Sequence, residues 1–198
     1  MVKLVIGITG TIGSGKEVVK EALVKNFSCY SVALSSVIKT QMKKKADRKS
    51  LQDMGNELRK KYGNFILAKL ATDYMQRDKE IIIVDGIRNP GEVDYLKKTF
   101  GNKFLLIAID APRELRWERI KARAREGDPK TWEEFLEVDE RDQGVGEPLY
   151  GQRVRDCIQM ADFLLINDGT PEEINEKVLK IVEELRRNPA RSSGEISS

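Results

Sequence analysis

Short apolar runs alternate along the chain with stretches in which apolar residues recur at helical spacing. One run, Ile81-Ile82-Ile83-Val84, is continuous and β-branched, which is typical of a strand covered on both faces. Strands of this kind that alternate with helices predict an α/β fold, a parallel sheet with helices on both of its faces. The predicted strands span residues 2–9, 30–34, 81–84, 103–109 and 163–166, and the predicted helices span residues 17–25, 50–77 (in two pieces, broken near Gly63-Asn64), 91–100, 112–125 and 171–187.

One region breaks this alternation. Residues 127–151 are acidic, contain several glycines and lie between a predicted helix and the last predicted strand. A mobile lid and an ordinary long excursion of the chain both fit this pattern, and both stay open. A length of 198 residues favours a single domain. We expect that domain over residues 1–187, with a polar, disordered tail at 188–198.

The segment from Gly10 to Lys16 matches the Walker A pattern GxxxxGK. It lies directly after an apolar strand and before an amphipathic helix, the context in which glycines let backbone N–H groups surround phosphate oxygens. Glu17 stands where Ser or Thr normally binds magnesium. A carboxylate is also a hard oxygen ligand, but it would equally repel phosphates, so both interpretations stay open. The predicted phosphate-binding residues are Gly10, Thr11, Ile12, Gly13, Ser14, Gly15 and Lys16.

A second candidate element follows the run at residues 81–84. Asp85 ends this buried strand, as the second metal-binding carboxylate does in proteins that transfer phosphoryl groups. Gly86 lets a ligand approach the backbone closely. Arg88 is expected in the crevice at the carboxyl ends of the strands, where α/β proteins bind ligands. A turn with a surface arginine is the alternative interpretation.

Three arginines recur on one face of the helix predicted at residues 112–125. Arg116, Arg119 and Arg123 have i, i+3, i+7 spacing, so their like charges repel unless they pair with nearby acids or share an anionic ligand. Guanidinium groups bind phosphate with two hydrogen bonds and stack on flat bases. We favour a shared ligand, because a phosphate loop is predicted in the same protein.

Composition narrows the chemistry. The net charge of +3 argues against general nucleic-acid binding, and the lack of histidine excludes His-based catalysis and His-containing zinc sites. Phosphoryl transfer needs neither. Cys29 and Cys157 fit a reducing cytoplasm, and residues 4–6 are too short an apolar run to span a membrane. We expect a cytoplasmic protein, and we interpret the basic run at 43–45 as a solvated helix face rather than a phosphate-attracting patch.

With these motifs, the chain resembles the nucleoside monophosphate kinase group of P-loop kinases over nearly its whole length. Asp85-Gly86-Ile87-Arg88 is similar to the adenylate kinase DGxPR element without its proline, which implies that Arg88 contacts the acceptor phosphate. Arg119-Ile120-x-x-Arg123 resembles the paired arginines at the lid entrance of those enzymes. Residues 161–169, ADFLLINDG, resemble the segment that lines the adenine pocket in dephospho-CoA kinase, which implies nucleotide-binding roles for Asn167 and Gly169.

Two further resemblances concern the acceptor side. Residues 51–59, LQDMGNELR, resemble an element of phage-type deoxynucleoside monophosphate kinases, which implies that Arg59 binds the acceptor. Those enzymes also carry an acidic residue after the loop lysine, as Glu17 does here. The stretches LQDMGNELRKKYGN, IRNPGEVDYLKK, LLIAIDAPRELRW, DERDQG and YGQRV resemble the kinase-like N-terminal domain of bacterial deoxycytidylate and antiphage dCTP deaminases. Without histidine or a Cys-x-x-Cys, the chain lacks their zinc deaminase half.

These inferences predict a P-loop kinase fold with a five-stranded parallel sheet between helices and with a helical lid. The predicted reaction transfers the γ-phosphoryl group of ATP, with Mg²⁺, to a (deoxy)nucleoside monophosphate. Two alternatives stay open: a dephospho-CoA kinase, and a domain that senses nucleotides without turnover. No membrane partner is expected, and the sequence leaves the oligomeric state open. The predicted roles are catalysis for Lys16, Asp85, Arg119, Arg123 and Arg141, metal binding for Glu17 and Asp85, and acceptor binding for Ser35, Lys39, Arg59 and Arg88.

Overall fold

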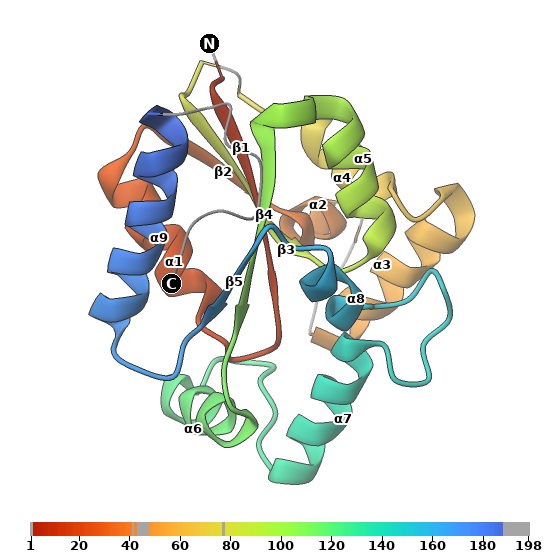
Figure 1. Ribbon diagram of the computed structural model, residues 1–198. Helices are drawn as coiled ribbons and strands as arrows, with labels where there is room; N and C mark the ends of the chain where they lie inside the picture. The colour runs from red at the N-terminus through yellow and green to blue at the C-terminus, as the bar shows by residue number, and fades with distance from the viewer. Residues whose placement is uncertain (1, 41, 43–47, 77, 188–198) are drawn as a thin grey trace.

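The computed structural model describes residues 2–40, 42, 48–76 and 78–187. The basic run at 43–45 and the tail at 188–198 lie outside the described residues. A five-stranded parallel sheet runs through the centre of the molecule in the order β2-β3-β1-β4-β5 (Figure 1). Its strands are β1 (Leu4–Gly10), β2 (Cys29–Ala33), β3 (Ile81–Ile87), β4 (Phe104–Asp110) and β5 (Phe163–Ile166).

Helices cover both faces of this sheet. On one face lie α1 (Lys16–Asn26) and α9 (Pro171–Arg187), which pack against each other. The opposite face carries helices from the middle of the chain and one from near its end (Figure 1). These helices are α2 (Leu34–Thr40), α3 (Arg48–Tyr62), α4 (Ile66–Asp73), α5 (Pro90–Phe100) and α8 (Val154–Gln159).

The two faces bury separate apolar clusters because side chains alternate along each strand. Ile6 and Ile8 of β1 pack with α1 and α9, whereas Val5 packs with α4 and α5 on the other face. All seven residues of β1 are buried. This double coverage is the reason that the strands read as continuous apolar runs in the sequence.

The predicted strands and helices are confirmed, with ends that differ by a few residues. The helical stretch predicted at 50–77 is indeed two helices, α3 and α4, separated near Gly63. Two short helices, α2 and α8, are absent from the prediction. Residues 127–151, predicted as a lid or a long excursion with no helix bounds given, contain α7 (Trp132–Gln143), which the Thr131 side chain caps at its amino end.

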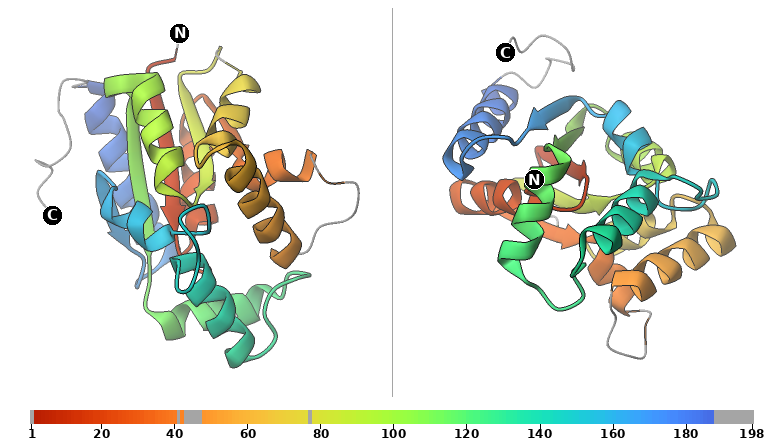
Figure 2. Two further views of the ribbon diagram at one scale, coloured as in Figure 1. Left: turned by 90° about the vertical axis from the view of Figure 1, so that its right-hand side faces the viewer. Right: turned by 90° about the horizontal axis from the view of Figure 1, so that it is seen from below.

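Two helices project beyond the carboxyl ends of the strands. They are α6 (Arg113–Arg123), which follows β4, and α7, and Figure 2 shows both at the same end of the molecule. The loops after β1, β3, β4 and β5 reach this end, so residues far apart in sequence meet there. Across the described part of the chain, no helix has the length and apolar character needed to cross a membrane.

Candidate functional site

The loop from Gly10 to Gly15 joins β1 to α1 and has the backbone of a phosphate loop. Gly10, Gly13 and Gly15 have positive φ values of 146°, 77° and 96°. At Gly15 a side chain is excluded twice, by this conformation and by the Asn167 side-chain nitrogen, which would lie 2.2 Å from an added Cβ. The loop ends at the first residue of α1, so its amides and the helix amino terminus face the same space, as an anion site requires.

Lys16 is folded over this loop. Its Nζ donates hydrogen bonds to the carbonyl oxygens of Gly10 at 2.8 Å and Thr11 at 2.6 Å. Burial is the main cause that lowers the pKa of Lys16 to about 7; the positive charge of Arg88 lowers it further, while Asp85 raises it. The ammonium group of Lys16 therefore loses its proton near pH 7, and a phosphate group beside it would restore its positive charge.

Side chains from the neighbouring strands hold the loop in place. Thr11 Oγ1 donates to Asp110 Oδ1, 2.6 Å away at the end of β4. Asn167, which follows β5, donates from Nδ2 to the carbonyl oxygen of Ser14 at 2.8 Å. The partners come from β4 and from the end of β5, which both lie on the same side of β1, so two strands hold the loop from that side of the sheet. The Ser14 hydroxyl is buried without a hydrogen-bond partner, as expected for a group that a ligand satisfies.

A bulge at Gly86 shapes the end of β3. The pairing of β1 with β3 shifts there, so that Ile8 lies opposite Asp85 while Thr9 lies opposite Ile87. Gly86 takes up the extra residue with a φ of 82°. Beyond the bulge Thr9 Oγ1 donates to the Ile87 carbonyl at 2.8 Å, which anchors the strand again. Asp85 is thus placed beside the phosphate loop.

The predicted metal ligands Glu17 and Asp85 both lie close to the side chain of Lys20. Lys20 Nζ forms an ion pair with the carboxylate of Glu17 and lies 3.9 Å from Oδ2 of Asp85. A cation thus already accompanies both carboxylates. Two carboxylates with phosphate and water oxygens are a donor set that suits Mg²⁺, and the described residues contain no cluster of three or more metal-binding side chains. The residues fit a magnesium ion that a nucleotide brings with it, provided that Lys20 moves aside.

Arg88 points into a cluster that we call the cation cluster: Arg48, Gln52 and Arg88 around the carboxylate of Asp142. Asp142 Oδ2 accepts a hydrogen bond from Arg48 Nη2 at 2.5 Å and lies 2.8 Å from Arg88 Nη1. Its Oδ1 accepts from Gln52 Nε2 at 2.6 Å. Burial alone would raise the pKa of Asp142, but the charges of Arg48 and Arg88 outweigh it and hold this pKa well below its usual range.

Arg59, which the resemblance implies as an acceptor ligand, lies elsewhere. Its guanidinium is buried and donates from Nε and Nη2 to Oε1 of Glu92, at 2.9 and 2.8 Å. The other oxygen of Glu92 accepts from the backbone N–H groups of Arg88 and Asn89. Arg59 thus supports the turn that carries Arg88, and its direct contact with an acceptor stays a prediction.

The arginines predicted on one face of α6 contact different partners. Arg116 is buried and binds both oxygens of Asp139, at 2.5 and 3.0 Å, as well as the carbonyl oxygen of Ile12. It therefore ties the phosphate loop to α7. A small apolar cluster that includes Ile12 and Phe135 covers this contact.

The other two arginines of α6 do not converge on one ligand. Arg119 donates to the carbonyl and side-chain oxygens of Asn167, at 2.9 and 3.3 Å, beside the phosphate loop. Arg123 pairs through two hydrogen bonds of 2.7 Å with Asp128. The expectation that the arginines of this face share an anion is therefore wrong for Arg116 and is not met by Arg123, whereas Arg119 lies at the site.

The remaining predicted residues are Arg141, Ser35, Lys39 and Gly169. Arg141 of α7 pairs with Glu147 at 3.0 Å and with Asp53 of α3 at 2.7 Å, so it ties the predicted lid to α3. Ser35 and Lys39 are exposed on α2, which directly follows β2. Gly169 is exposed in the loop before α9.

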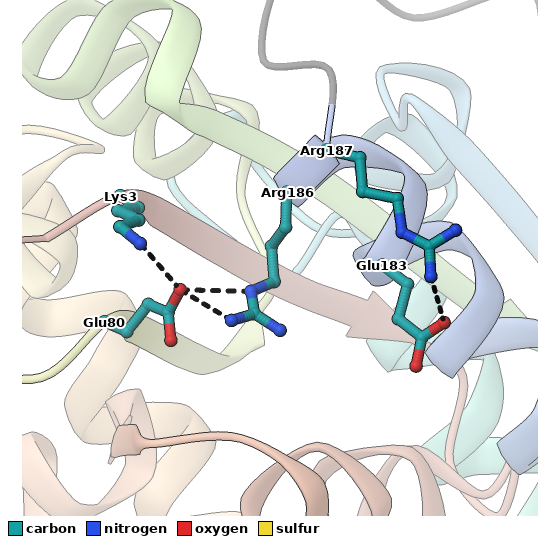
Figure 3. A pocket seen from close by; sticks show the side chains of 5 residues that line it. All are labelled: Lys3, Glu80, Glu183, Arg186 and Arg187. Carbon is teal, nitrogen blue, oxygen red and sulfur yellow. Dashed lines mark hydrogen bonds and ion pairs between the residues drawn. The ribbon is translucent and has the colours of Figure 1, made fainter.

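A pocket of about 300 Å³ lies at the opposite end of the molecule (Figure 3). It is lined by Lys3, Glu80, Glu183, Arg186 and Arg187. Glu80, just before β3, pairs there with Lys3 and Arg186, and Glu183 pairs with Arg187. Because these charges already satisfy one another and lie far from the phosphate loop, we assign no chemistry to this pocket.

Sequence reasoning missed four residues of the site: Lys20, Arg48, Gln52 and Asp142. Gln52 and Asp142 stand in stretches that carry the family resemblance, LQDMGNELR and DERDQG, which was the available signal. Nothing local marks Arg48, because its partner Asp142 is 94 residues away in the sequence. Only the folded chain brings α3 and α7 together.

Sequence comparisons find archaeal relatives. The chain is 34% identical over 191 residues to the UPF0200 protein MJ1399 of Methanocaldococcus jannaschii, covering 93% of this chain and 92% of the relative. It is 32% identical over 191 residues to a UPF0200 protein of Thermococcus gammatolerans, covering 93% and 96%. Neither relative is named as a deaminase or a dephospho-CoA kinase, so these matches lend no support to those two resemblances.

Comparison with solved structures finds kinases of the same fold. A shikimate kinase from Aquifex aeolicus aligns with a TM-score of 0.53 and 17% identity, covering 93% of this chain and 99% of that one. A putative kinase from Chloroflexus aurantiacus aligns with a TM-score of 0.58 and 18% identity, covering 94% and 97%. These similarities confirm the predicted P-loop kinase fold. A family model described as "AAA domain" matches residues 6–143, so the chain belongs to this AAA-domain family and, through its archaeal relatives, to the UPF0200 family.

Proposed function

We propose that the protein transfers the γ-phosphoryl group of Mg-ATP to a small acceptor that itself carries a phosphate, of the (deoxy)nucleoside monophosphate class. One observation carries the proposal: the loop lysine lies within electrostatic reach of a second group of cations. Thr9, the residue before the loop, donates to the carbonyl oxygen of Ile87, the residue before Arg88, so the turn that carries Arg88 lies beside the loop. Burial lowers the pKa of Lys16 most; Arg88 and Arg48 lower it further, while Asp85 and Asp142 raise it. A donor-phosphate site and a second anion site therefore adjoin each other, as transfer between two phosphate-bearing molecules requires.

On the donor side, the loop amides and Lys16 would hold the triphosphate. Glu17 and Asp85 would hold Mg²⁺, which would neutralise charge on the phosphates. Arg119 and Asn167, which contact each other beside the loop, would border the nucleotide, with Gly169 close by in sequence. Residues 127–151 would act as the lid, and Arg123 and Arg141 would add positive charge where it closes.

On the acceptor side, Arg88 would bind the acceptor phosphate, with Ser35 and Lys39 at the rim. An ionised phosphate oxygen would attack the γ-phosphorus, the bond to the β-phosphate oxygen would break, and ADP would leave. This step needs no general base, because the attacking oxygen carries no proton. The lack of a base is consistent with the site, in which Asp142, the carboxylate that pairs with the Arg88 guanidinium, has a lowered pKa.

Two alternatives remain as outcomes of the test. A dephospho-CoA kinase must deprotonate a hydroxyl, and Asp142 with its lowered pKa would be a weak base for that step. A nucleotide-sensing domain would bind ATP without turnover, and the pairing of Glu17 with Lys20 is compatible with it.

The test is to incubate the protein with Mg-ATP and a panel of nucleoside monophosphates and dephospho-CoA, and to measure ADP. We expect ADP formation that depends on one class of monophosphate. Tight nucleotide binding without acceptor-dependent ADP would refute the kinase proposal and favour sensing. Formation of ADP with dephospho-CoA alone would favour the first alternative.

Lys16→Ala is the control for the donor site. The variant loses the ammonium group that contacts the loop and should therefore lose triphosphate binding and turnover together. If activity survives this substitution, the phosphate loop is not the donor site.

A further inference from the structure

The centre of the acceptor side is filled by a carboxylate of the protein itself. Asp142 belongs to α7, within the segment predicted to be a lid, whereas Arg48 and Gln52 belong to α3 and Arg88 follows β3. Its side chain has no exposed surface. Three elements that are separate in sequence thus meet at one anion, next to the phosphate loop.

The groups around Asp142 are those that proteins use to bind phosphate. Two guanidinium groups and one amide surround its oxygens, all within 2.8 Å. Arg–carboxylate and Arg–phosphate pairs share the same planar donor geometry, so a carboxylate and a phosphate compete for such a site. The donors of the cation cluster would donate hydrogen bonds to phosphate oxygens in place of the carboxylate oxygens.

The carboxylate does not use all of these donors. Nε of Arg48 is buried without a hydrogen-bond partner. Nη1 of Arg88 is ion-paired with Asp142 at 2.8 Å, but the angles of this contact are not those of a hydrogen bond. Buried donors without acceptors are costly and are rare in native proteins. A phosphate has more acceptor oxygens than a carboxylate, so it could satisfy donors that Asp142 leaves unpaired.

We propose that the Asp142 carboxylate occupies the subsite for the acceptor's phosphate, so that α7 closes this subsite with an anion of its own until a phosphate displaces it. The assignment of this subsite to the acceptor's phosphate rests on the proposed function. The proposal adds Arg48 and Gln52 to Arg88 as phosphate ligands. Displacement frees α7 from α3 on this side, so acceptor binding and lid movement are one event.

Another buried aspartate on the same helix differs from Asp142. Asp139, three residues earlier, accepts hydrogen bonds from Arg116 and Gln143. All three side-chain nitrogens of its main partner, Arg116, donate hydrogen bonds, because Arg116 also binds two backbone carbonyl groups. Asp139 is therefore a structural ion pair, whereas the partners of Asp142 keep donors for another ligand.

The test measures the binding of inorganic phosphate, because this probe needs no turnover and no knowledge of the acceptor. In Asp142→Asn the cation cluster keeps its shape and loses its internal anion. We expect this variant to bind phosphate at least about tenfold more tightly than the wild type in isothermal titration calorimetry. Adding Arg88→Gln to the variant distinguishes phosphate bound in the cation cluster from phosphate bound at the P-loop. The second substitution should abolish the gain in affinity.

The matched control is Asp53→Asn. Asp53 pairs with Arg141, so this substitution also removes an aspartate contact between α3 and α7, but it lies outside the cation cluster. It should leave phosphate affinity within about twofold of the wild type. An equal gain in Asp53→Asn would mean that loosening of α7 alone opens the site, and it would overturn the proposal. So would unchanged or weaker phosphate binding in folded Asp142→Asn.

A measurement on the wild type covers the case in which Asp142→Asn does not fold. Phosphate should speed hydrogen exchange at the backbone amides of α7, and chloride at the same ionic strength should not. Unchanged or slower exchange in α7 with phosphate would overturn the proposal. Neither assay depends on kinase activity, so a failed kinase test and a failed subsite test give different results.

Discussion

Replacing Arg59 with methionine tests whether this residue stabilises the fold or contacts the acceptor directly. The substitution removes the guanidinium and keeps much of the side-chain volume. Glu92 Oε1 then loses the hydrogen bonds that it accepts from Nε and Nη2 of Arg59, at 2.9 and 2.8 Å. Since both side chains are buried, water cannot replace these donors without a local opening of the structure.

The expected loss of stability is large. Removing one partner of a buried ion pair typically costs about 3–5 kcal/mol, because the other charge stays buried. In a domain of this size each kcal/mol lowers the melting temperature by about 2–4 °C, so we expect a decrease of about 6–20 °C. Glu92 also accepts from the backbone N–H of Arg88 at 2.8 Å, so the turn that carries Arg88 should loosen and acceptor affinity should fall as a secondary effect.

Urea denaturation of the wild type, Arg59→Met and Arg59→Met/Glu92→Gln measures this loss. The double variant removes the unpaired charge, so it should recover part of the stability. The reasoning is refuted if Arg59→Met changes the free energy of unfolding by less than about 1 kcal/mol while acceptor affinity falls tenfold or more. That result would mean that Arg59 contacts the acceptor directly, as the resemblance to deoxynucleoside monophosphate kinases implies.

Four further predictions concern the donor site. The pKa of Lys16 is lowered to about 7 in the folded protein, against 10.5 for an unperturbed lysine, so the unfolded chain binds more protons between these values and the stability of the free protein should rise with pH across this window. Triphosphate binding at pH 8 should take up about 0.9 proton, visible as buffer-dependent heats in calorimetry, and no uptake at pH 8 would contradict the lowered pKa. Lys20→Gln removes the cation that pairs with Glu17, so half-saturation by Mg²⁺ in a nucleotide-binding assay should occur at a severalfold lower concentration, and a higher requirement would count against a metal site there. Gly15→Ala combines a φ of 96° with a Cβ 2.2 Å from Asn167, so nucleotide affinity should fall at least about tenfold, and an unchanged affinity would show that the loop can adjust.

The sequence alone determined the sheet, the helices around it and the phosphate loop. Each of these features is indicated by residues that are close together in the sequence. The β-branched run at 81–84 predicts a strand buried on both faces, and the glycines at 10, 13 and 15 predict a backbone with positive φ at the end of another strand. A pattern of a few residues carries each signal, so no knowledge of distant contacts was needed. The bounds of the helix within 127–151 could not be predicted in this way. Charged residues interrupt the apolar positions of α7, whose buried side includes Phe135.

Only the tertiary structure decided which charges pair. Arg116, Arg119 and Arg123 share a helix face in sequence, yet they bind Asp139, Asn167 and Asp128 respectively. Helical spacing gives the direction of a side chain, but the partner depends on which element packs opposite. Arg59 and Glu92 are 33 residues apart, and Arg48 and Asp142 are 94 apart. An ion pair forms wherever the fold places opposite charges a few ångströms apart in a buried setting, and the packing of α3, α5 and α7 sets that distance.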